Sequence, residues 1–64
     1  MWSRIKEAAR ELGSRSELPN QGQAEAIVSD LAAQERANLP IEAREFLASE
    51  LVALAREAQE KVAQ

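Results

Sequence analysis

Residues 44–63 read REFLASELVALAREAQEKVA, and this stretch decides the fold because it predicts most of one long helix. Leu47, Leu51 and Leu54 recur at helical spacing and make an ordinary apolar stripe. At about 100° per residue, however, the apolar positions of residues 41–62 cover about half of the helix circumference. A helix packed against one neighbour needs an apolar arc of only about 100°. The long helix is therefore expected to contact two separate surfaces.

The length and composition of the chain bound the fold. A chain of 64 residues is one small domain, and its abundant Ala, Glu, Leu, Gln and Arg predict an all-α class. A core of this size supplies about 3–5 kcal/mol, so small proteins often add a disulfide, a metal or a second copy. The chain has no cysteine and no histidine, which argues against the first two devices. The sequence therefore predicts a helical-bundle homodimer, with a monomeric three-helix bundle as the alternative.

Apolar periodicity and break signals predict three helices, over about residues 2–12, 20–37 and 40–62. The apolar positions of the first helix share one narrow sector of the wheel, and they are Ile5, Ala8, Ala9 and Leu12. Gly13 follows directly and is expected to adopt the left-handed conformation that ends many helices.

The second helix has both a start signal and an apolar stripe. Asn20 is expected to cap it, because Gln23 three residues later completes a capping box. Its stripe consists of Ala24, Ile27, Val28 and Leu31. Pro40 is at home in the first turn of the third helix, and the short connection before it predicts an antiparallel hairpin of helices two and three. Two such hairpins are expected to form the four-helix core of the dimer, braced by the first helix.

Four apolar residues are candidates for a dimer or partner interface: Trp2, Ile41, Phe46 and Val52. Trp is the residue type most enriched in interface anchors, although closing the end of a small core is the favoured interpretation of Trp2. Phe46 lies on the far flank of the third helix, where the hairpin does not cover it; the alternative is packing under the first helix. Ile41 and Val52 lie at the edge of the apolar arc.

Glu35 and Arg44 are the polar residues that point along the apolar sides of their helices. In an antiparallel hairpin that turns at residues 38–39, the two side chains lie at a similar height. We therefore expect an ion pair that closes the hairpin end, contributing about 0–1 kcal/mol where it is exposed. The alternatives are two side chains free in solvent or a contact to a partner.

The residue types present argue against an enzyme. The chain has no His, Cys, Tyr or Thr, so the commonest general bases and nucleophiles are absent, and no cofactor or metal is expected. Residues 17–64 carry four cations against nine carboxylates, a net charge of −5. Such a surface favours a basic partner. The sequence predicts a non-enzymatic protein–protein interaction module, an inhibitor, adaptor or regulator whose partner has a basic or apolar surface.

Two alternative functions rest on the first helix. Residues 1–16 have a net charge of +2, and a nucleic-acid-binding regulator would use the cations of this segment: Arg4, Lys6, Arg10 and Arg15. The net charge of −3 for the whole chain argues against it. Peripheral membrane attachment would use Trp2 and the same cations, but Glu7 and Glu11 lie on the polar face of that helix. With no secretory signal pattern and no cysteine, a cytoplasmic location is expected.

Overall fold

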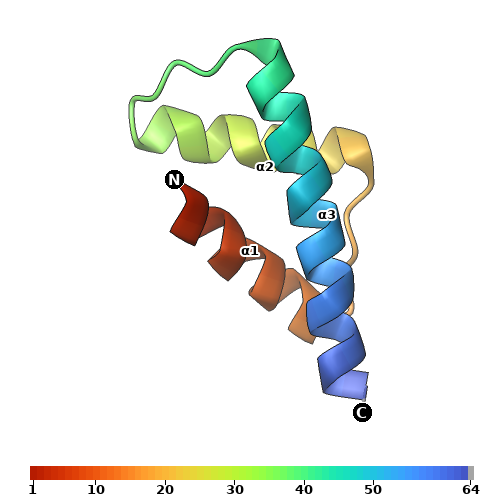
Figure 1. Ribbon diagram of the computed structural model, residues 1–64. Coiled ribbons are helices and arrows are strands. Elements are labelled where there is room, and N and C mark those ends of the chain that lie inside the picture. The colour runs from red at the N-terminus through yellow and green to blue at the C-terminus, as the bar shows by residue number, and fades with distance from the viewer. Residues whose placement is uncertain (64) are drawn as a thin grey trace.

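The computed structural model describes residues 1–63, which form three helices and no strand (Figure 1). The helices are α1 (Trp2–Ser14), α2 (Gln21–Gln34) and α3 (Ile41–Ala63). The predicted all-helical fold with three helices is confirmed. The predicted bounds differ from these by no more than three residues, the largest difference being the early end of α2.

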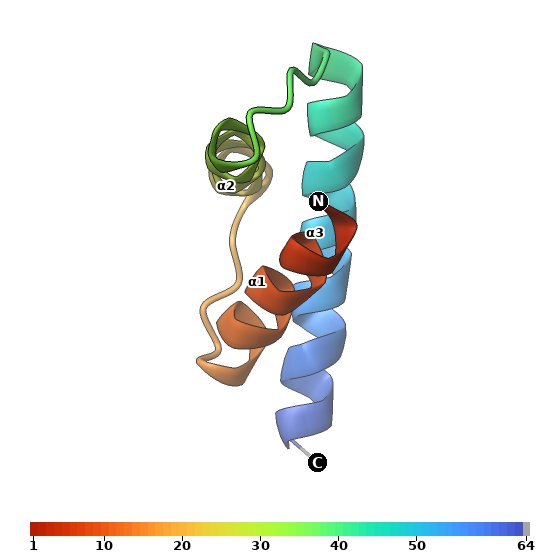
Figure 2. The same ribbon diagram turned by 90° about the vertical axis from the view of Figure 1, so that its left-hand side faces the viewer.

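Helix α3 is the central element of the molecule. Helix α1 runs obliquely along its C-terminal half, and α2 lies across its N-terminal half (Figure 1). Figure 2 shows α1 and α2 on the same broad side of α3. The molecule measures 38 × 18 × 13 Å, so it is long and thin. The two surfaces that the wide apolar arc of α3 requires are therefore supplied by α1 and α2 of the same chain, and the opposite side of α3 is open.

The antiparallel hairpin predicted for the second and third helices is wrong, because α2 crosses α3 (Figures 1 and 2). The cause is the position at which α2 ends. Arg36 adopts a left-handed backbone conformation with a φ of 55°. The backbone N–H of Ala37 then donates to the carbonyl of Ala32 at 2.8 Å, which closes the helix. Six residues, 35–40, connect the helices in place of a tight turn, and they let α2 turn across α3.

Helix α1 ends in the same way as α2, and this corrects the role predicted for Gly13. Ser16 adopts a φ of 58°, and the N–H of Glu17 donates to the carbonyl of Leu12 at 2.9 Å. Both ends are Schellman motifs, in which a left-handed residue lets late backbone N–H groups satisfy the last carbonyls of the helix. Gly13 stays inside α1, with a negative φ, because it is buried against α3 and cannot act as the terminating residue.

The start of α2 is as the sequence predicts. The Asn20 side chain accepts a hydrogen bond from the Gln23 backbone N–H at 2.8 Å, and the Gln23 side chain accepts from the Asn20 N–H at 3.0 Å. This capping box satisfies two N–H groups that would otherwise lack partners. It fixes the first turn of α2 despite the helix-weakening Gly22.

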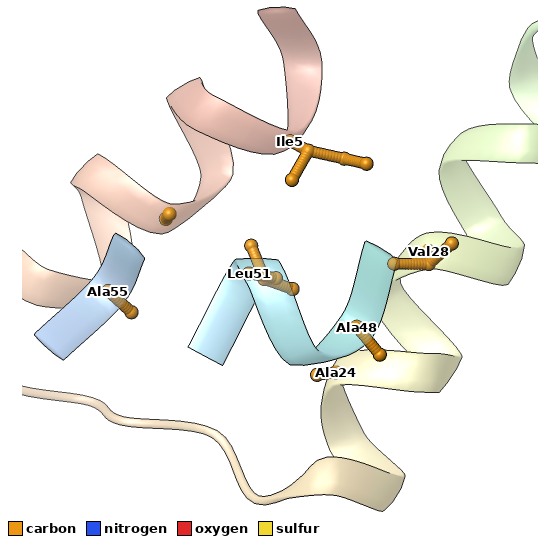
Figure 3. Close-up of a cluster of buried hydrophobic side chains, with 7 residues drawn as sticks. Ile5, Ala24, Val28, Ala48, Leu51 and Ala55 are labelled. Carbon is orange, nitrogen blue, oxygen red and sulfur yellow. The ribbon is translucent and has the colours of Figure 1, made fainter. Parts of the chain in front are cut away.

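The core is built from small side chains. Its fully buried hydrophobic residues are Ile5, Ala9, Ala24, Val28, Ala48, Leu51 and Ala55. Leu51 of α3 lies between Ile5 of α1 and Val28 of α2 (Figure 3). The buried positions of α1 and α2 repeat every four residues, and ridges of that spacing favour oblique helix crossings. Because most core residues are alanines, the helices approach closely but bury little apolar volume.

Candidate interaction surfaces

The four predicted interface residues have different environments. Ile41 and Phe46 are each 62% exposed, and Trp2 is 46% exposed. Val52 is half-buried and packs against the core. Helix α3 therefore begins with two large apolar side chains in water, whereas Val52 is largely covered by the chain's own helices.

Phe46 projects from an acidic part of α3. Glu42 and Glu50 lie one helical turn before and after it, and residues four apart on a helix are neighbours. Arg44, the nearest cation in sequence, is turned to the other side of the helix, where its Nη1 donates to the Ser29 hydroxyl at 3.5 Å. We call Glu42, Phe46 and Glu50 the Phe46 patch. It is an exposed aromatic ring flanked by two carboxylates.

A second surface lies between α1 and α3, and it is not among the sites predicted from the sequence. This α1/α3 groove has a volume of about 320 Å³ and is lined by Lys6, Ala9, Arg10, Ser14, Leu54, Glu57, Ala58, Lys61 and Val62. Its floor is apolar, and Val62 is 61% exposed there. Lys6 comes from α1 and Lys61 from the last turn of α3, so the two are far apart in sequence. The two lysines line the same rim only because α1 and α3 cross, and no local sequence pattern predicts that crossing.

The ion pair predicted between Glu35 and Arg44 is replaced by other contacts. Glu35 Oε1 lies 3.1 Å from the amino group of Met1 and 3.9 Å from Arg4 Nε. Arg4 Nη1 also donates to Gln34 Oε1 at 2.9 Å. The reason is the crossing of α2, whose C-terminal end lies beside the start of α1. Glu35 therefore pairs with the amino group of Met1 and with Arg4, and these contacts link the end of α2 to the start of α1.

Two further hollows belong to the connections between helices. A hollow of about 410 Å³ beside Leu18 and Ile27 separates the first connection from α2, and Leu18 is 39% exposed at its edge. A hollow of about 200 Å³ lies beside Ser29 and Arg44. The Nε of Arg44 is buried there without a hydrogen-bond partner. The lining of each hollow includes one charged residue, Glu17 in the first and Arg44 in the second, whereas four charged residues line the α1/α3 groove.

Within residues 1–63, no group of three or more His, Cys, Asp or Glu side chains could hold a metal ion. No helix in this part of the chain is long and apolar enough to cross a membrane. No protein-family model, curated protein or solved structure matches the chain. The Phe46 patch and the α1/α3 groove are thus the two surfaces from which a function can be argued.

Proposed function

We propose that this chain is a non-enzymatic protein–protein interaction module, an inhibitor, adaptor or regulator that packs a face of α3 on a protein partner. One observation carries the proposal: Phe46 is 62% exposed on a regular helix, with a carboxylate one turn away on each side. An aromatic anchor with a polar rim is the usual composition of the energetic centre of an interface. Burying such a side chain is worth about 1.5–3 kcal/mol.

The charges around Phe46 describe the partner. Glu42 and Glu50 would repel an acidic surface and favour one that offers an apolar hollow with cations at its edge. Ile41, 62% exposed, lies near the same end of α3, but five residues at about 100° each turn it to a different face from Phe46. The partner surface is therefore apolar at its centre and basic at its rim.

The two alternative functions of the first helix are less well supported. Arg4 is engaged by Gln34 and Glu35, which leaves fewer cations for phosphates. For a membrane, the helix would need a free apolar face. Ile5 and Ala9 on that face are fully buried against the core. An interaction with protein through α3 is therefore preferred.

The proposal is tested by a photoreactive phenylalanine derivative incorporated at position 46 of the full chain under native conditions. We expect discrete adducts that excess unlabelled wild-type chain competes away and the Phe46→Ser chain does not. The same group at position 7, exposed on α1, is the matched control. Equal and diffuse labelling from positions 46 and 7 would contradict the proposal.

A further inference from the structure

We infer that the occupant of the α1/α3 groove is Phe46 of a second copy of this chain, so that two copies bind each other reciprocally. The inference rests on the proposed function, in which Phe46 is a contact residue. It adds the identity of the partner and of the surface that receives the ring.

The size and lining of the groove fit one aromatic side chain. Its volume of about 320 Å³ lies at the lower end of the range for binding pockets, which run from about 300 to 1,000 Å³. Ala9, Leu54 and Ala58 give it an apolar floor, and Val62 extends that floor toward solvent. A flat apolar ring with no polar atom can be buried there without losing a hydrogen bond.

The charges of the two surfaces are opposite. The groove rim carries Lys6, Arg10 and Lys61 against Glu57, a net charge of +2. The Phe46 patch carries two carboxylates, a net charge of −2. Among residues 1–63, the ion pairs are those of Glu35 with the start of α1, so neither surface is neutralised within its own chain. Complementary charge of this kind orients two surfaces and accelerates their encounter.

The positions of the two surfaces along α3 allow both contacts to form at once. The shared flank consists of Phe46, Glu50, Leu54, Glu57 and Lys61, which are spaced three or four residues apart. In an antiparallel pair of α3 helices with its two-fold axis near residues 51–52, Phe46 faces the partner near Glu57. The same register brings Glu42 opposite Lys61, and the symmetry repeats each contact.

Trp2 fits the same arrangement. It lies one helical turn before Lys6 on α1, so its half-exposed indole is on the same side of α1 as that residue of the groove rim. Its contact with the second copy would account for the exposure of an aromatic residue beside a closed core.

The test is a charge exchange between the two surfaces in the full-length chain. One variant reverses the groove rim (Lys6→Glu with Arg10→Glu), and the other reverses the patch (Glu42→Lys with Glu50→Lys). In each variant alone, like charges face each other in both contacts, and we expect association at least about tenfold weaker than for wild type. In a mixture of the two variants both contacts regain opposite charges, so a mixed dimer should form with near wild-type affinity.

The control is Glu7→Lys with Glu11→Lys, which makes the same change of charge as the patch variant, on exposed positions of α1 away from the groove. It should leave association within about twofold of wild type, and circular dichroism should report equal helix content for all variants. A wild-type chain that stays monomeric near 1 mM, or a mixture that does not associate, overturns the inference. If position 46 then still labels another protein, the proposed function stands while the pairing of copies falls.

Discussion

Gly13 of α1 and Ala58 of α3 meet so closely that a Cβ atom built on Gly13 would lie 2.5 Å from the Cβ of Ala58. The Cβ atom built on Gly13 would also lie 2.6 Å from the carbonyl oxygen of Ala55. Real Cβ atoms do not approach this closely, so the contact exists only because residue 13 has no side chain. It fixes where α1 crosses α3, and that crossing forms the two walls of the α1/α3 groove.

Gly13→Ala is therefore expected to destabilise the fold by about 1–3 kcal/mol, because overpacking at a helix crossing forces the backbones apart. Gly22→Ala is the matched control, since its Cβ would meet only Asn20 Oδ1, at 3.5 Å. That change should stabilise α2 by about 0.5–1 kcal/mol. Urea unfolding followed by circular dichroism measures both, and a Gly13→Ala chain as stable as Gly22→Ala would refute the close crossing.

The two left-handed residues give a prediction of the opposite sign. Ser16 and Arg36 end α1 and α2 with φ values of 58° and 55°, a conformation that costs side-chain-bearing residues about 1–2 kcal/mol. Ser16→Gly and Arg36→Gly relieve that strain but increase the freedom of the unfolded chain. We expect each to stabilise the protein by about 0.5–1 kcal/mol. In thermal melts, Ser14→Gly inside α1 should instead lower the midpoint; a lower midpoint for Ser16→Gly as well would be inconsistent with the Schellman end.

Leu51 is the largest test of the core. It is fully buried on α3 between α1 and α2, and truncation of a buried leucine costs about 2–5 kcal/mol. In a domain of this size, Leu51→Ala is expected to abolish most of the helical signal at 25 °C. Ile41→Ala, at a position 62% exposed on the same helix, should change stability by no more than about 0.5 kcal/mol. Similar stabilities for the two variants would mean that the assigned core face of α3 is wrong.

Local features of the sequence predicted local features of the fold. The capping box of Asn20 and Gln23 involves residues three apart, and the stripe around Leu51 follows from helical spacing. The capping box depends on interactions within one helix, and the stripe needs only an apolar neighbour, whichever helix supplies it. The number of helices and the burial of α3 on two sides were predictable for the same reason.

The crossing of the helices was not predictable from such patterns. A glycine near a helix end usually terminates it, yet Gly13 is needed for close approach to α3. Ser16 and Arg36, which do terminate helices, have no distinctive sequence signal. Because α2 ends at Gln34 and crosses α3, Glu35 contacts the amino group of Met1 and does not form the predicted ion pair with Arg44. The α1/α3 groove was not predictable for the same reason, because its cations come from helices that are distant in sequence.

The most direct test of the account is sedimentation equilibrium of the full chain, wild type and Phe46→Ser, over a wide range of concentration. The wild-type mass is expected to rise toward twice 7.0 kDa as concentration increases. Phe46→Ser should stay near 7.0 kDa with the same helix content, since the ring it removes is 62% exposed and outside the core. Identical masses for the two chains at every concentration would contradict the claim that Phe46 is the contact between copies.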